Sequence, residues 1–164
     1  MTAIQCARLQ GYAAIIATSS LKHEEYLKSL GATHIIDRNL PPADVQAQAR
    51  ILAAGKPIIY VYDAIGARDE QRLSYELLED SGAFVTVEPF SQGYIEDLVT
   101  ESKPVIRVYG LFDAPGNYKL GSEVCSRLPE WLATGVIKVC LVAYSSLHAS
   151  PRTLISFNHV SRIG

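Results

Sequence analysis

The sequence has little cysteine and no pattern that would use it. Three cysteines occur in 164 residues, at Cys6, Cys125 and Cys140. Their spacing matches no zinc-binding motif, and an odd number cannot pair completely in a disulfide framework. The four histidines also stand at no metal-ligand spacing from a cysteine or a carboxylate. We therefore expect free thiols in a reducing compartment and no metal site.

Long apolar runs and a strong charge of one sign are lacking as well. Runs such as AAIIA, at Ala13–Ala17, are far too short to span a bilayer. Gln5 and Arg8 interrupt the N-terminal segment, so it does not resemble a signal peptide. The formal net charge of −2 implies no basic face for nucleic acid. We expect a cytoplasmic protein that binds neither a membrane nor nucleic acid.

Familiar catalytic signatures are missing too. The sequence contains neither the G-x-S-x-G turn of serine hydrolases nor a P-loop. Tyr26 and Lys28 stand two residues apart, not at the Tyr-x-x-x-Lys spacing of short-chain reductases. No general acid stands out, so the sequence assigns no catalytic residue.

What the sequence does contain is an alternation of short apolar segments with helical patterns. This alternation favours an α/β fold with a parallel sheet covered on both faces. Residues after Leu147 lose all periodicity, which predicts an irregular tail over 148–164. The expected strands are Ala13–Thr18, His34–Asp37, Ile58–Tyr62, Ala83–Val87, Val105–Tyr109 and Val136–Val142. The expected helices are Met1–Gln10, Glu24–Leu30, one that Pro41 and Pro42 open and that ends at about Ala54, Asp69–Asp80 and Gly121–Thr134, the last kinked or split by Pro129.

Candidate binding residues follow the ends of the first two expected strands, because open parallel sheets bind ligands at their carboxyl edge. Ser19, Ser20 and Lys22 offer hydroxyl and ammonium donors that suit a phosphate. No acidic residue stands there to accept a free ribose hydroxyl, which favours NADP over NAD. A second interpretation is that Ser19 or Ser20 only caps the next helix. Arg38 is either a further phosphate or adenine contact or a solvated surface arginine.

Later strand ends add small and apolar residues. The turn Ala64–Gly66 would let backbone amides approach a cofactor closely, although it also fits an ordinary strand-to-helix turn. Tyr109, Leu111 and Phe112 follow the next strands and would line a pocket.

Several motifs together resemble the medium-chain dehydrogenase/reductase superfamily. They are IQCARLQGY (Ile4–Tyr12), IIATSS (Ile15–Ser20), LKSLGATHIID (Leu27–Asp37) and VYDAIG (Val61–Gly66). A further stretch, LPEWLATGVIK (Leu128–Lys138), resembles more narrowly the zinc-independent trans-acting enoyl reductases of fungal polyketide pathways. The resemblance extends to about Leu147.

The resemblance implies a Rossmann domain joined to a GroES-like catalytic domain. It also implies NADPH-dependent reduction of a carbon–carbon double bond in an acyl chain carried by a polyketide synthase. By this resemblance, Ser19, Ser20 and Lys22 would hold the adenosine 2′-phosphate, and Arg38 stands where relatives often have a tyrosine near it. Ala64, Ile65 and Gly66 would lie beside the nicotinamide ribose, and Leu111 and Phe112 would flank the nicotinamide ring.

Departures from the family pattern shape the expected fold. Met1 stands immediately after the position of the glycine-rich turn, and His159–Gly164 replaces a Ser-Gly-x-Lys-Leu type ending. We therefore expect a partial Rossmann domain over 1–147, an incomplete parallel sheet without its usual first strand and turn, and no GroES-like domain. The gap would expose two sheet edges. Three outcomes remain open. The two flanking strands pair directly with each other, another chain fills or covers the gap, or the isolated chain is only marginally stable and aggregates.

Three functions remain open from the sequence. The first is a fragment or degenerate homologue of an enoyl reductase, inactive on its own, with NADP binding weak or lost. Its partners would be a polyketide synthase, a full-length reductase or a second copy at the exposed sheet edge. The second is an active enoyl reductase. The third is a non-redox enzyme such as a cyclase, motivated by Phe90, Tyr109 and Phe112.

Overall fold

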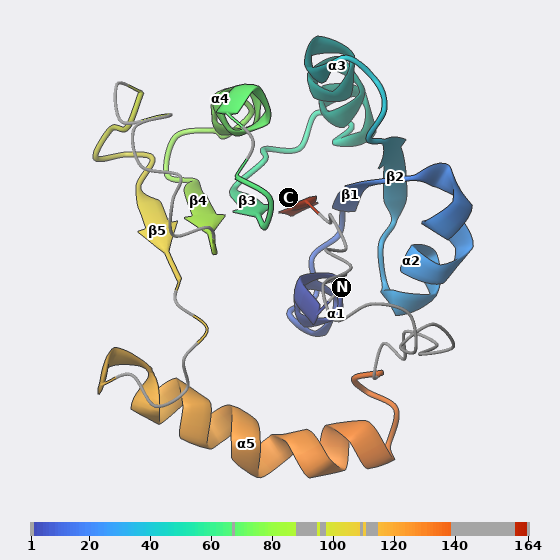
Figure 1. Cartoon of the computed structure of the whole chain (residues 1–164), viewed down its shortest axis with the longest axis vertical. Coiled ribbons are helices and arrows are strands. Elements are labelled where there is room, and N and C mark those ends of the chain that lie inside the picture. The colour runs from blue at the N-terminus through green and yellow to red at the C-terminus, as the bar shows by residue number, and fades with distance from the viewer. Residues whose placement is uncertain are drawn as a thin grey trace, which may run out of the picture. The chain divides into compact units, whose positions relative to one another are not determined.

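A computed structural model gives the fold of the chain (Figure 1). It describes residues 2–66, 68–87, 95, 98–108, 110 and 115–138, and the backbone of 160–163. The chain divides into two compact units. One comprises Met1–Gly110 with Asn158–Gly164, and the other comprises Leu111–Phe157.

The first unit is built on a sheet in the order β2-β1-β6-β3-β4-β5 within the described residues. The strands are β1 (Ile15–Ser19), β2 (His34–Asp37), β3 (Tyr60–Asp63), β4 (Ala83–Thr86), β5 (Val105–Arg107) and β6 (Val160–Ile163). The helices of this unit are α1 (Thr2–Leu9), α2 (Glu24–Leu30), α3 (Pro42–Leu52), α4 (Arg68–Glu76) and the short 3₁₀ helix η1 (Leu21–His23). Figure 1 shows α1 and α2 on one face of the sheet and α3 and α4 on the other.

The pairs β1/β2, β3/β4 and β4/β5 are all parallel, which confirms the predicted α/β class. A Rossmann sheet has the order 3-2-1-4-5-6. Here β2 and β1 take the places of strands 3 and 2, and β3, β4 and β5 take those of strands 4, 5 and 6. The predicted lack of a parallel first strand therefore fits the described sheet.

The predicted gap in the sheet is wrong, because β6 fills it. β6 runs antiparallel to both neighbours, with Arg162 opposite Ile16 of β1 and Val61 of β3. The sheet is therefore mixed, and Val160–Ile163 does not belong to an irregular tail. Unpaired backbone groups along two interior strands are costly, so a short segment of the same chain pairs with them.

The main core lies between the sheet and the helices α3 and α4. Phe84, Ile36 and Val61 of the strands are completely buried there. Tyr75 of α4 packs against Phe84 with ring centroids 6.1 Å apart. On the opposite face, Ile4 of α1 and Leu27 of α2 are also completely buried. Burial on both faces explains why the strands read as continuous apolar runs.

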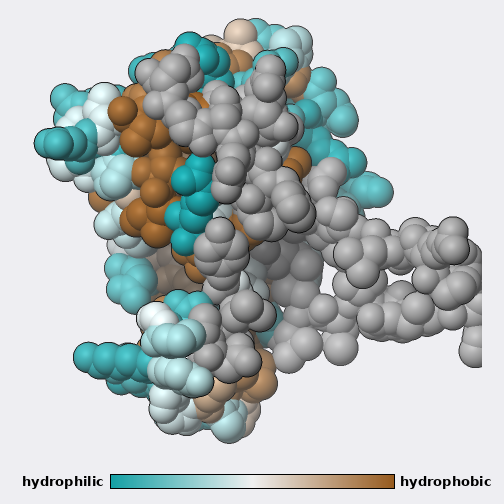
Figure 2. All heavy atoms as spheres, turned by 60° about the vertical axis from the view of Figure 1, so that its left-hand side comes forward, coloured by the Kyte–Doolittle hydropathy of each residue, from teal (hydrophilic) through white to brown (hydrophobic). Residues whose placement is uncertain are grey.

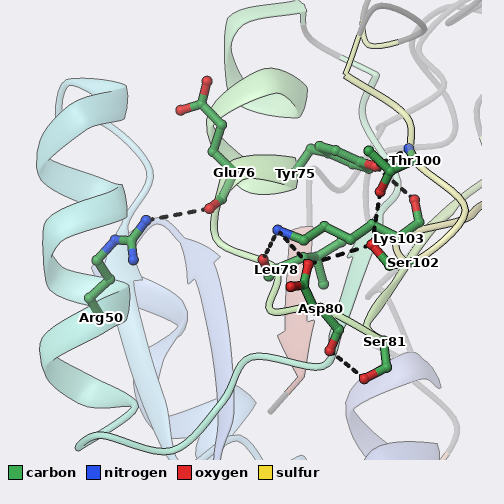
Figure 3. Close-up of polar contacts among 9 residues, drawn as sticks. All are labelled: Arg50, Tyr75, Glu76, Leu78, Asp80, Ser81, Thr100, Ser102 and Lys103. Atoms are coloured by element: carbon green, nitrogen blue, oxygen red, sulfur yellow. Dashed lines mark hydrogen bonds and ion pairs between the residues drawn. The ribbon is translucent and has the colours of Figure 1, made fainter.

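The loop before β5 is fastened to the end of α4 by Lys103 and Tyr75 (Figure 3). The Lys103 ammonium donates to the Leu78 carbonyl at 2.6 Å, and the Tyr75 hydroxyl donates to the Lys103 carbonyl at 2.7 Å. The backbone N–H of Thr100 donates to the same hydroxyl at 3.2 Å. These bonds hold the loop that leads into β5 against the end of α4.

β5 forms one edge of the sheet. Its Ile106 is 45% exposed, and Figure 2, which turns this side forward, shows apolar residues gathered there. Among the described helices, none combines the length and apolar character that a membrane span requires.

The second unit contains the short 3₁₀ helix η2 (Pro115–Asn117) and α5 (Tyr118–Ala133). α5 confirms the predicted helix, but it continues through Pro129, so the predicted split is wrong. The first three residues of the predicted strand Val136–Val142 are not a strand either. Gly135 has a φ of 69°, and the Ile137 N–H donates to the Trp131 carbonyl at 3.1 Å, which closes the helix end instead. The remainder of that segment lies outside the described residues.

Candidate functional site

A cavity of about 290 Å³ lies at the carboxyl ends of β1, β2 and β3. Because ligands of open parallel sheets bind at this edge, the cavity is the leading candidate for a site. Thr18 belongs to the end of β1, and other lining residues follow β2 and β3 or belong to α3 and α4. The lining residues are Thr18, Arg38, Asn39, Leu40, Pro42, Val45, Ile65, Glu70 and Leu73.

The wall after β2 is shaped by Asp37. One of its carboxylate oxygens, Oδ1, accepts hydrogen bonds from the backbone N–H and the side-chain amide of Asn39, each at 3.0 Å. The Arg38 N–H donates to the Ser19 carbonyl at 3.0 Å, which joins the ends of β1 and β2. Arg38 and Asn39 are thereby held at the rim of the cavity with exposed side chains.

The wall after β3 is shaped by Asp63, which is 3% exposed. Its Oδ1 accepts hydrogen bonds from the backbone N–H groups of Ile65, at 2.9 Å, and Gly66, at 3.1 Å. Its Oδ2 accepts a short hydrogen bond from the Gln71 side chain of α4. Three donors therefore compensate the buried carboxylate and fix the turn that places Ile65 in the cavity wall.

Two of the residues predicted from the sequence, Arg38 and Ile65, line this cavity together. Ala64 and Gly66 lie in the same turn as Ile65, with Gly66 at a φ of 77°. That positive φ favours glycine and supports the interpretation of a special backbone turn.

The predicted phosphate residues Ser19, Ser20 and Lys22 follow the same strand end but do not line the cavity. Ser19 is 1% exposed within β1. Ser20 occupies the N-cap position of η1, but its side chain makes no capping hydrogen bond there. The N-cap of α2 is His23, which leaves no capping role for Ser19 there. Lys22 is exposed. Their contact with a phosphate stays a prediction.

Several predicted residues cannot be placed. Leu111 and Phe112, assigned to the nicotinamide ring, lie outside the described residues, as do Phe90 and Tyr109. Conversely, the sequence interpretation missed Thr18, Asn39, Glu70 and Leu73 of the cavity. The strand-end rule, that ligands of a parallel sheet bind where its strands end, could have found Thr18 and Asn39. Glu70 and Leu73 belong to α4 and line the cavity only because α4 packs beside it.

The chemistry of the cavity suits a polar ligand with an apolar part. Arg38 and Asn39 supply donors, Glu70 supplies an acceptor, and Ile65 and Leu73 supply apolar surface. Tyr62 of β3 is half-buried, and burial raises its pKa, with the charges of Cys6 and Asp63 adding to the effect. Tyr62 does not line the cavity.

Within the part of the chain that the structure describes, no group of three histidine, cysteine or carboxylate side chains is arranged to hold a metal ion. The described residues therefore do not fit a zinc site.

A family model described as zinc-binding dehydrogenase matches residues 1–104. The chain is also 31% identical over 136 residues to a trans-enoyl reductase of Aspergillus japonicus. The matched region covers 82% of this chain and 37% of that protein. The chain thus spans little more than a third of that curated relative.

Solved structures give the same fold. The crystal structure of CurK enoyl reductase matches with a TM-score of 0.63 and 22% identity, covering 83% of this chain and 40% of that chain. A mycobacterial protein in complex with NADPH matches with a TM-score of 0.56 and 20% identity, covering 77% and 39%. The family-model match and the Rossmann strand order together show that this chain belongs to the zinc-binding dehydrogenase family of the medium-chain dehydrogenase/reductase superfamily.

Proposed function

We propose that the chain is the nucleotide-binding part of an NADPH-dependent enoyl reductase of the polyketide type, and that it holds the adenosine end of the cofactor without reducing a substrate on its own. The cavity at the carboxyl ends of β1, β2 and β3 carries this proposal. The similarity to a trans-enoyl reductase supports the substrate class, an acyl chain on a polyketide synthase, which would be the partner.

The cavity residues fit the adenosine 2′-phosphate half of NADP. The Arg38 guanidinium would pair with the 2′-phosphate or stack on the adenine, and Ile65 and Leu73 would pack against the base. Lys22, exposed beyond the end of β1, would add charge near the phosphate. When bound, the cofactor supplies a hydride; the chain's own part is to bind and orient it.

Binding should nevertheless be weak. In a Rossmann domain, the central strand leads through a glycine-rich turn into a helix whose N-terminus holds the pyrophosphate. Here the central position is occupied by β6, which runs in the opposite direction, with Val160 opposite Thr18 at the cavity edge. β6 therefore begins at the cavity edge and ends at the opposite edge of the sheet, so it does not lead into a turn beside the pyrophosphate. Losing two charge-assisted contacts of about 1.5–3 kcal/mol each weakens binding by roughly two to four orders of magnitude.

Calorimetry with 2′,5′-ADP and 5′-AMP tests the proposal. We expect the 2′-phosphate compound to bind at least about tenfold more tightly, a free-energy difference of about 1.4 kcal/mol, and Arg38→Ala to abolish that preference. Lys56→Ala is the matched control, because Lys56 is an exposed cation before β3, at the opposite end of the strands. A folded chain that binds neither nucleotide contradicts the proposal.

A second assay addresses the chemistry. NADPH oxidation with a crotonyl thioester should be absent for the purified chain. Measurable turnover would contradict the inactive assignment and favour an autonomous reductase.

A further inference from the structure

β6 is paired on both sides over most of its length. Ser161 lies opposite Ala17 of β1 and Tyr62 of β3, and Ile163 lies opposite Ile15 and Tyr60. A strand paired on both sides is an interior strand, although this one comes from the far end of the chain.

The position of β6 is the structural centre of the sheet. It corresponds to the first strand of the order 3-2-1-4-5-6, with two strands on one side and three on the other. α1 also contacts it. All five residues of β1 are buried, and Val61 of β3 is completely buried. Without a strand in this position, both neighbours would expose unpaired backbone groups inside the protein.

The occupied position also sets the width of the candidate site. Adjacent strands lie about 4.8 Å apart, so one inserted strand separates β1 from β3 by about 9.6 Å. The cavity takes Thr18 from β1 and Ile65 from the turn after β3, on the two sides of β6. Direct pairing of β1 with β3 would bring these two walls together by one strand spacing.

We propose that Val160–Ile163 keeps the candidate cavity open by holding β1 and β3 one strand apart, and that this segment comes from the same chain and not from a second copy. The chain then needs no second molecule at this position. Any parallel strand offered from elsewhere must displace β6 before it can enter the sheet.

Engineered disulfides test the insertion and its direction in the full chain. The cysteines Cys6, Cys125 and Cys140 are first replaced by serine. In the antiparallel register, Val160 lies opposite Thr18, so Thr18→Cys with Val160→Cys should form a disulfide within one chain. Ile15→Cys with Val160→Cys is the matched control, because Ile15 lies opposite Ile163, about 10 Å from Val160 at 3.4 Å per residue.

The outcome is read on non-reducing gels. A monomeric cross-link for the first pair and none for the control supports the proposal. A cross-link for the control pair alone means a parallel strand and overturns it. Cross-linked dimers mean that strands are exchanged between copies, and no cross-link in either pair means that β6 is not inserted; both results overturn it.

Hydrogen exchange gives an independent measurement on the unmodified chain. We expect the amides of Ser161 and Arg162 to exchange at least about 100-fold more slowly than in an unstructured peptide. Ser161→Pro removes the backbone donor that lies opposite Tyr62 of β3 and should speed exchange of the Tyr62 amide, whereas Ser161→Ala keeps the donor and should not. Unprotected amides in the wild-type chain overturn the proposal. Neither experiment requires a ligand, so the proposal about β6 can fail or succeed independently of the proposed function.

Discussion

Asp63 at the end of β3 and Gln71 of α4 form a buried pair that joins the sheet to the helix beside the cavity. The side-chain amide of Gln71 donates to Oδ2 of Asp63, and the two side chains are 2% and 3% exposed. Oε1 of Gln71 is buried without a hydrogen-bond partner among the described residues. Asp63 thus controls both the local turn and the placement of α4.

Asp63→Ala should lower the free energy of unfolding by about 3 kcal/mol, because three donors lose their charged acceptor inside the protein. Urea denaturation measures the change. Asp69→Ala, which removes an exposed carboxylate from the same helix, is the control and should have little effect. Equal effects of the two substitutions would show that the buried network does not stabilise the fold.

Gly31→Ala should destabilise the protein by about 1–3 kcal/mol through strain and a clash. Gly31 ends α2 with a φ of 119°, and an added Cβ would lie 2.8 Å from Cβ of Arg8. Gly55→Ala provides the comparison, since Gly55 also has a positive φ, of 76°, but open space around it. The difference between the two variants in thermal or urea unfolding measures the clash with Arg8 together with the greater backbone strain at a φ of 119°. No difference would mean that α1 moves aside freely.

Lys103→Met should reduce stability by about 1–2 kcal/mol, because the Leu78 carbonyl loses its 2.6 Å donor. Asp80→Asn should change little, since the Asp80 side chain is 87% exposed and lies 3.9 Å from the ammonium. Figure 3 shows both partners around Lys103. If Asp80→Asn lowered stability more than Lys103→Met, the ion pair with Asp80 would matter more than the hydrogen bond to the Leu78 carbonyl, contrary to this prediction.

Stability should fall at alkaline pH, in part through Tyr62. Its pKa is raised above the ordinary 10.0, mainly by burial. The folded state therefore holds this proton more tightly than the unfolded state. The resulting stabilisation is complete below pH 10 and is lost as the pH rises through the folded pKa. Tyr62→Phe should flatten the decline in urea midpoint between pH 9 and pH 11. An unchanged slope would exclude Tyr62 as the titrating group.

Apart from β6 and the short η1, the helices and strands of the first unit follow from local sequence patterns. Glu24–Leu30 forms a helix because its apolar residues share one face and Gly31 accepts the left-handed end. His34–Asp37 was predicted with the bounds that the structure has. The strand-end rule also placed Arg38 and Ile65 at the carboxyl edge, and both line the cavity.

The errors arise where local signals compete with packing. Pro129 predicted a kinked or split helix, and the split is wrong: α5 runs through Pro129, because one lost hydrogen bond does not outweigh the rest of the helix. Val136–Val142 resembles a strand, yet its first residues close the end of α5. The four residues of β6 have no alternating apolar and polar pattern, so no local signal predicted a strand there.

The sequence by itself determined the α/β alternation, the parallel strands and the edge of the sheet where a ligand would bind, because these depend on periodicity and on strand-end chemistry. Only the tertiary structure decided which segment fills the centre of the sheet and which residues of α4 complete the cavity. Glu70 and Leu73 reach the cavity through the packing of α4, and Val160–Ile163 enters because β1 and β3 need a hydrogen-bonding partner. Both depend on contacts between segments far apart in the chain, which no local pattern encodes.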